Sequence, residues 1–260
     1  MATTVASSAA APEASPPDVG SVAAGSAPSW RTRFVLMVVA ALLAGFALRV
    51  AISLTDDAPA TDETAYLRSG VSLVEGDGFQ REGQPELHFP PFVPFLLGLA
   101  SRVTSDPHTG TVVLTCLSST ALIVPLALLG RRIAGPVAGM AAAWVAALGP
   151  GLSTTLVNRA AGSEAEYTLL VVGALWLVIS AADHHDRARW WRVFGAGVLV
   201  GLAYLTRPEG LLMAVPLGAA VLFLAVRRPG QDARLRRADL RRVRSGAPLL
   251  AVFLLPIVVC

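Results

Sequence analysis

The sequence predicts an all-α, polytopic helical membrane protein, and its composition, its apolar runs and its arginines each indicate this. Hydrophobic residues make up 54% of the 260 residues and charged residues only 15%, whereas a soluble domain carries about a quarter charged residues. The apolar residues form continuous runs near the ~20 residues that an α-helix needs to cross a bilayer. All 21 basic residues are arginine, and they gather between these runs, as expected for loops at a membrane face.

The first 29 residues differ in composition from the rest. Residues 1–29 consist largely of Ala, Ser, Pro and Gly, so they bury too little surface to offset their chain entropy, and we expect a disordered cytoplasmic tail. A cleaved signal peptide would begin with its charges and apolar core. Here Arg31 and Arg33 come late, and the run to Leu54 is long enough to span. We therefore expect a retained signal-anchor helix that opens a transmembrane domain over 30–260.

Six apolar runs are expected to cross the membrane, and a seventh begins near residue 247. The six runs are 34–54, 111–130, 134–152, 166–182, 191–206 and 209–226. Pro208 is expected in a tight turn between the last two. The apolar stretch 90–103 is too short to cross, which favours an interfacial helix within the first outer loop, 55–110. Only 14 residues follow Gly246, fewer than a span needs, so we expect the N-terminal part of a longer protein.

The arginines predict the orientation of the chain. With the N-terminus in the cytoplasm, the expected cytoplasmic segments hold 15 arginines and the outer segments five, while Arg49 falls inside the first span. Because arginine-rich loops stay in the cytoplasm, we expect a multi-pass plasma-membrane protein whose loop 55–110 lies outside. The eight arginines within 227–244 fit a topology determinant that touches anionic membrane lipids, and not a nucleic-acid site.

Polar side chains that can carry chemistry gather at the expected outer face. Asp62 and Glu63 lie near the start of the outer loop, and ionisable groups held at a membrane usually have a function there. Either carboxylate can accept a proton from an attacking nucleophile, and Arg159 or Arg207 can hold a departing phosphate. The further candidates for substrate binding are Tyr66, His88, Glu164 and Glu209.

Five short segments follow one another between residue 30 and about residue 226. They are TDETAYLRSGVSLVEGDGF at 61–79, HFPPFVPFLLGLA at 88–100, GRRIAGPVAG at 130–139, GSEAEY at 162–167 and LTRPEG at 205–210. Their order resembles the GT-C glycosyltransferase superfamily, in particular the branch of protein O-mannosyltransferases and aminoarabinose transferases (glycosyltransferase family 39-like). Each segment is short, and the resemblance rests on their order and topology together.

The resemblance implies a GT-C-like fold and an inverting transferase that uses a polyprenyl-phosphate-linked sugar at the extracytoplasmic face. It implies that Asp62 is the catalytic base and that Glu63 assists it or tunes its pKa. Arg159 or Arg207 is the candidate to hold the donor phosphate. The acceptor is left open among lipid, glycan and protein, and the sequence indicates no certain cofactor.

Plainer interpretations stand beside these for the single residues. Asp62 and Glu63 can be solvated loop charges. His88 can lie at the headgroup level, or it can join a carboxylate in a divalent metal site. Glu209 can lie in a capped turn, where the dipole at the N-terminus of the next helix stabilises its charge. Glu164 can form an ion pair with Arg159.

For the whole chain, the alternative is a non-enzymatic membrane protein, such as a transporter or flippase of envelope precursors. Such a protein is expected to carry polar or broken helical elements at mid-membrane, between internal repeats. The spans have few charges at their centres and no clear repeat, which favours the enzyme. A fragment that lacks donor-binding residues, and therefore activity, is the third alternative.

Overall fold

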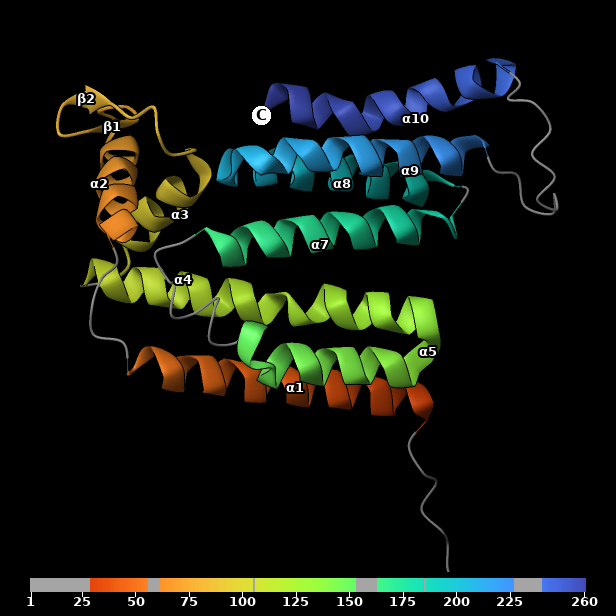
Figure 1. The fold of residues 1–260 in the computed structure, drawn as a ribbon, viewed down its shortest axis with the longest axis horizontal. Helices are drawn as coiled ribbons and strands as arrows, with labels where there is room; N and C mark the ends of the chain where they lie inside the picture. Colours follow the sequence, from red (N-terminus) through yellow and green to blue (C-terminus); the bar gives the residue numbers. More distant parts are fainter. Residues whose placement is uncertain (1–28, 56–60, 105, 153–162, 185, 227–239) are drawn as a thin grey trace, which may run out of the picture.

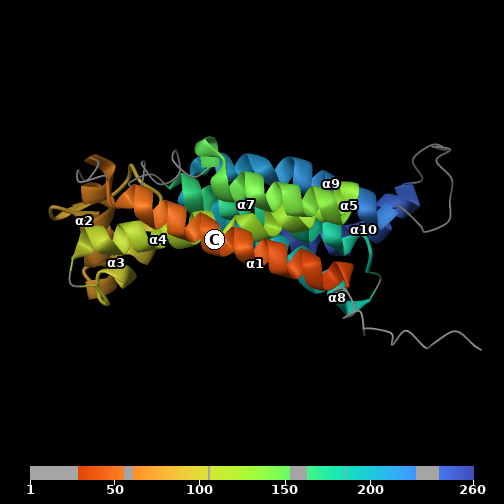
Figure 2. The same ribbon diagram turned by 90° about the horizontal axis from the view of Figure 1, so that it is seen from below.

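The computed structural model describes residues 29–55, 61–104, 106–152, 163–184, 186–226 and 240–260. Its long helices lie side by side with nearly parallel axes (Figures 1 and 2). They are α1 (Trp30–Ser53), α4 (Pro107–Ala121), α5 (Ile123–Leu148), α7 (Glu164–Ala181), α8 (Arg187–Thr206), α9 (Ala214–Val226) and α10 (Leu240–Val259). A 3-10 helix, η1 (Pro208–Met213), links α8 to α9.

A smaller group of elements sits at one end of this bundle, on the left of Figure 1. It consists of α2 (Thr61–Glu75), the strands β1 (Gln80–Arg81) and β2 (Gln84–Pro85), and α3 (Phe92–Ala100). We call this end of the bundle the α2 end. The last turn of α1, the first turns of α4 and α7, and η1 all lie at the α2 end (Figure 1).

The predicted all-α fold of a membrane protein is confirmed. By length and composition, three helical segments of the described chain can cross a membrane, namely Trp30–Ser53, His108–Leu148 and Glu164–Ala181. Pro208–Leu224 and Gly246–Val259 are shorter apolar helices. The number of spans stays a prediction, because length and composition alone do not establish it.

The helical segment that ends at Leu148 is a hairpin. Ala134 (φ −134°, ψ 17°) and Gly135 (φ 89°) leave the helical conformation, and Pro136 follows. A side chain at Gly130 would place its Cβ only 2.9 Å from the carbonyl oxygen of Ala138, so the two arms pack closely. The expected spans 111–130 and 134–152 are therefore the two arms, and the chain reverses over 134–136.

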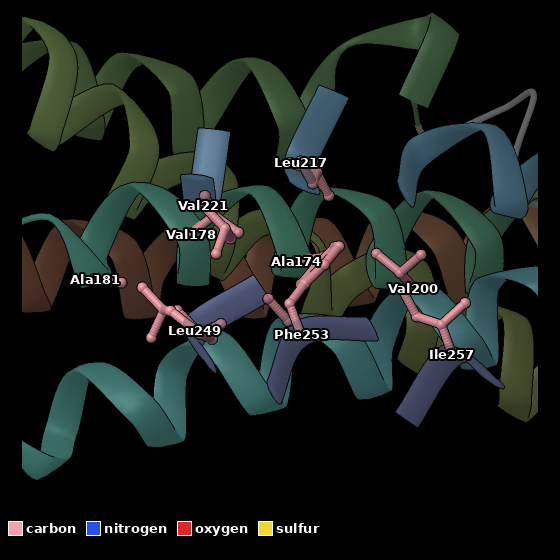
Figure 3. Close-up of a cluster of buried hydrophobic side chains, with 11 residues drawn as sticks. Ala174, Val178, Ala181, Val200, Leu217, Val221, Leu249, Phe253 and Ile257 are labelled. Carbon is pink, nitrogen blue, oxygen red and sulfur yellow. The ribbon is translucent and has the colours of Figure 1, made fainter. Parts of the chain in front are cut away.

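Small residues let α7, α8, α9 and α10 pack closely. Figure 3 shows side chains of α7, α8, α9 and α10 that meet in one buried apolar cluster, which includes Val178, Val200 and Phe253. A Cβ at Gly197 of α8 would lie 2.1 Å from the carbonyl oxygen of Phe253 in α10. Membrane helices gain stability from such van der Waals packing at small residues.

The loop expected between the first two spans is largely structured. Residues 61–75 form α2, and the hairpin β1–β2 turns at Glu82 (φ 56°) and Gly83 (φ 76°). The predicted surface helix at 90–103 corresponds to α3, which begins at Phe92 and ends at Ala100. Gly70 of α2 and Gly98 of α3 bring the two helices into backbone contact. A Cβ at Gly70 would lie 1.9 Å from the backbone oxygen of Pro94.

Candidate active site

Asp62 and Glu63 occupy the first turn of α2. Negative charges are stabilised there by the unpaired N–H groups and the dipole of the helix N-terminus. An α-helix turns once every 3.6 residues, so the side chains of consecutive residues diverge by ~100°. The Asp62 side chain is exposed, whereas Glu63 is only 1% exposed. Only Asp62 is therefore open to a ligand from solvent.

Glu63 binds a histidine that the sequence did not single out. Its Oε1 lies 2.8 Å from Nδ1 of His108 in the first turn of α4. With Glu63 ionised, the ring nitrogen donates this hydrogen bond. Asp106 caps the same helix end, since its Oδ2 accepts from the Thr109 N–H at 2.8 Å. The Glu63–His108 bond therefore ties the start of α2 to the start of α4.

Tyr66 packs one turn along α2 from Asp62. Its side chain is 6% exposed and lies in an apolar cluster with Val93 and Leu97 of α3. The Phe89 ring meets its ring edge to face, with centroids 4.6 Å apart. These apolar contacts therefore fix the position of the Tyr66 ring and of its hydroxyl group.

The environment of this hydroxyl keeps it neutral. Burial raises the pKa of Tyr66, and the neighbouring Ser163 hydroxyl partly offsets the rise. The charges of Asp62, Arg207 and Glu164 also act on the pKa of Tyr66, so these side chains lie close to it. Because its pKa is raised from an ordinary value of 10.0, the phenol is protonated at neutral pH and can donate a hydrogen bond.

Arg207 joins the end of α8 to the start of α7. Its Nε donates to Ser163 Oγ at 2.8 Å, and its Nη2 donates to Glu164 Oε1. Gly210 makes this turn possible, because a Cβ there would lie 2.4 Å from the backbone carbon of Ala203. Arg207 keeps 34% of its side chain exposed, so its remaining N–H groups are accessible to a ligand.

Three separate parts of the chain thus meet at the α2 end. They bring together four of the predicted residues, which are Asp62, Tyr66, Glu164 and Arg207. Among the described residues, Oε2 of Glu164 and both carboxylate oxygens of the nearby Glu166 have no hydrogen-bond partner. Glu166 is 4% exposed, and no pattern in the sequence distinguishes it from the other glutamates. The cluster is therefore rich in acceptors around one guanidinium.

The other predicted residues lie elsewhere. The exposed His88 ring packs edge to face on Phe89, with centroids 4.7 Å apart, and no contact between His88 and Tyr66, Asp62 or Arg207 is found among the described residues. Glu209 is exposed in η1. Arg159 lies outside the described residues, which leaves its predicted pairing with Glu164 untested. Within the described ranges, no group of three or more His, Cys, Asp or Glu side chains is placed to hold a metal ion.

A structural comparison shows the fold. The chain is similar to the crystal structure of the Archaeoglobus fulgidus oligosaccharyltransferase in the apo form, with a TM-score of 0.63 and 18% sequence identity. The match covers 87% of this chain and 32% of that chain, so this chain spans about a third of the length of that protein. Among curated proteins, no sequence matches this chain.

A sequence comparison shows the family. The profile of the dolichyl-phosphate-mannose-protein mannosyltransferases matches residues 88–255. This range holds Glu164, Arg207 and Glu209 and begins after Asp62 and Tyr66. It covers more than half of the chain and four of the five segments whose order resembles the GT-C enzymes, and the segment 61–79 precedes it. The chain belongs to the dolichyl-phosphate-mannose-protein mannosyltransferase family.

Proposed function

We propose that this protein is a membrane glycosyltransferase that transfers a sugar from a polyprenyl-phosphate donor to an acceptor at the extracytoplasmic face. One observation carries the proposal. In a chain of this family, the exposed Asp62 carboxylate, the neutral Tyr66 phenol and the partly exposed Arg207 lie together at the end of a helical membrane bundle.

The roles of the residues follow from their chemistry. The acceptor oxygen or nitrogen forms a bond to the anomeric carbon while the bond from that carbon to the phosphate oxygen breaks. Asp62 accepts the proton of the acceptor. The phosphate leaves with the bonding electron pair, and the accessible N–H groups of Arg207 stabilise its charge. A single displacement of this kind inverts the configuration of the sugar.

The position of the buried carboxylate and guanidinium groups in the long helices favours an enzyme over a transporter. A transporter binds its substrate near the middle of the membrane. Among the described residues of the long helices, the side chains that bury such a group are Arg49, in the last turns of α1, and Glu166, in the first turn of α7. Both therefore lie near the α2 end and not halfway along the bundle.

The test compares Asp62→Asn with Asp77→Asn in membranes that contain the full-length protein. Asp77 is an exposed aspartate just after α2, so it controls for the same chemical change in the same loop. Both variants and the unchanged protein receive a panel of radiolabelled polyprenyl-phosphate sugars, and label is followed into protein, lipid and glycan. Loss of a general base lowers turnover by about 10²–10⁴-fold, so we expect this loss in Asp62→Asn and unchanged turnover in Asp77→Asn.

Two outcomes would contradict the proposal. Near-normal turnover by an inserted Asp62→Asn protein would remove Asp62 from the role of base. An absence of transfer from every donor by the inserted, unchanged protein would contradict the donor class and favour the transporter.

A further inference from the structure

Ser163 lies directly before α7, at the position that caps a helix N-terminus. A serine at this position usually accepts a hydrogen bond from an N–H group of the first turn. Asp106 caps α4 in this way and Asp186 caps α8, but the Ser163 side chain makes no such bond. Ser163 is nevertheless only 1% exposed. Its buried hydroxyl is therefore used for contacts other than the capping of α7.

The Ser163 hydroxyl accepts a hydrogen bond from Arg207, the residue that ends α8. Nε of Arg207 donates to Ser163 Oγ at 2.8 Å, and Nη2 donates to Glu164 Oε1. In the planar guanidinium group, Nε–H and one N–H of Nη2 point from the same edge. Ser163 and Glu164 therefore hold this edge. The edge formed by Nη1 and the other N–H of Nη2, which we call the free edge, has no bonded partner within the described chain and suits two oxygens of a phosphate.

Ser163 also connects Arg207 to α2. Burial raises the pKa of Tyr66, and the Ser163 hydroxyl partly offsets this rise, so the two hydroxyl groups are neighbours. A serine hydroxyl has one hydrogen to donate and can accept at the same time. It can therefore donate toward Tyr66 while it accepts from Arg207. The Tyr66 ring is itself held by Val93 and Leu97 of α3.

This connection bears on the geometry of the proposed reaction. In a single displacement, the attacking acceptor and the departing phosphate lie on opposite sides of the anomeric carbon. Asp62, which takes the proton of the acceptor, lies one turn before Tyr66 on α2, and Arg207 lies at the end of α8. A misplacement of about 1 Å between such groups can lower a rate about 10²-fold. Ser163 provides a polar contact that joins the two sides.

We propose that Ser163 is a positioning residue, which holds the free edge of Arg207 toward the departing phosphate and at a fixed distance from Asp62. The inference rests on the proposed function and adds a residue that touches neither the sugar nor the phosphate. During transfer, the bond from the anomeric carbon to the phosphate oxygen breaks and its electron pair stays on that oxygen, which gives the phosphate a second negative charge. An arginine that is already oriented stabilises this charge without reorganisation.

The first test measures binding and needs no sugar transfer. Farnesyl phosphate, and farnesol as the same chain without the phosphate, are titrated into the full-length protein in detergent by calorimetry. We expect Ser163→Ala and Arg207→Ala to raise the Kd for farnesyl phosphate about tenfold or more, as for the loss of an oriented hydrogen bond to a charged group. The Kd for farnesol is expected to stay unchanged.

Two further variants separate the hydroxyl from the shape of the side chain. Ser163→Cys keeps the shape but replaces the hydroxyl with a weak acceptor, so we expect the same loss of farnesyl phosphate binding as in Ser163→Ala. Ser180→Ala makes the same change near the other end of α7, where the hydroxyl donates to the Leu177 carbonyl. We expect this control to bind farnesyl phosphate as the unchanged protein does.

The second test is a double-mutant cycle on sugar transfer. We expect Arg207→Ala to lower kcat about 10²–10³-fold and Ser163→Ala about 10–10²-fold. The KM for the donor is expected to change less than about threefold, because the second charge of the phosphate develops only in the transition state. The double variant is expected to match Arg207→Ala, since Ser163 acts through Arg207. A merely structural role would lower the amount of folded protein and leave kcat per folded protein unchanged.

Three results would overturn the proposal. Normal binding of farnesyl phosphate and normal kcat in Ser163→Ala or Ser163→Cys would show that the hydroxyl does not position Arg207. Losses that multiply in the double variant would show that Ser163 acts independently of Arg207. Equal binding of farnesyl phosphate and farnesol by the unchanged protein would remove Arg207 from the phosphate. If phosphate binding depends on Ser163 and Arg207 but no donor supports transfer, the proposed function fails and the positioning of Arg207 by Ser163 stands.

Discussion

The neighbouring carboxylates of Asp62 and Glu63 show what a single sequence can and cannot predict about a site. The sequence makes both of them candidates because they lie together near the start of a loop. The structure places Asp62 in solvent and buries Glu63 against His108, 45 positions further along the chain. The direction of each side chain depends on the rotation of α2 against α4, and no pattern in the sequence connects Glu63 to His108.

The sequence identifies Arg207 and Glu164 as candidate site residues, but it does not predict that they form an ion pair. Each lies in a short segment that resembled the family, and the structure joins them through an ion pair that also holds Ser163. In the sequence, Arg207 and Arg159 are both candidates to hold the phosphate. The sequence does not distinguish them, because the contact between the end of α8 and the start of α7 exists only in the folded bundle.

The Glu63–His108 bond leads to a prediction about stability. A hydrogen bond to a charged group contributes about 1.5–3 kcal/mol, and His108 keeps 35% of its side chain exposed, which favours the lower part of this range. We expect Glu63→Ala and His108→Ala each to lower the free energy of unfolding, and the double variant to lose little more than either. Denaturant unfolding in detergent measures this cycle. Losses that simply add would show that the two side chains do not interact energetically.

At the scale of elements, the apolar helices were predictable and α2 was not. Long apolar runs identify spans directly, and the short run at 90–103 indicated α3. Residues 61–75 are acidic, polar and apolar in turn, a pattern that predicts part of a loop. The helix forms because Ala65, Tyr66 and Ser69 share one face that packs in the interior, and because Gly70 and Gly98 let α3 approach. These contacts lie between elements, so local sequence could not predict them.

The contact between α2 and α3 gives a second prediction. A Cβ at Gly98 would lie 2.2 Å from the backbone oxygen of Gly70, so Gly98→Ala must push the two helices apart. Overpacking of this kind costs about 1–3 kcal/mol, and we also expect slower sugar transfer because α2 carries Asp62. Thermal unfolding and the transfer assay measure the two effects.

Gly173→Ala is the matched control for Gly98→Ala. The atom nearest to a Cβ at Gly173 is Cδ1 of Leu199, at 3.1 Å, which is the end of a side chain that can move. We expect the thermal stability and the transfer rate of this variant to stay close to those of the unchanged protein. Equal losses of stability and of transfer in the two variants would show that the close α2–α3 contact is not their cause.

For the whole molecule, the fold class was predictable because it depends on properties of the entire chain. Continuous apolar runs and clustered arginines predicted a helical membrane bundle, and both comparisons agree with it. The order of the helices also brings the described parts of the segments expected outside, which are α2, α3, the start of α7 and η1, to the α2 end (Figure 1). The packing partners of each helix could not be predicted, because many different helix arrangements would satisfy the same hydropathy pattern.

The arginines predict which end faces the cytoplasm, and this prediction is testable on intact cells. In a Cys260→Ser background, one variant carries Glu75→Cys at the end of α2, and another carries Trp190→Cys in the first turn of α8, at the opposite end of the bundle. Both positions are exposed. Since arginine-rich loops are retained in the cytoplasm, a membrane-impermeant maleimide should label position 75 directly and position 190 only after permeabilisation. The reverse pattern would place Asp62 and Arg207 in the cytoplasm and would contradict transfer at the extracytoplasmic face.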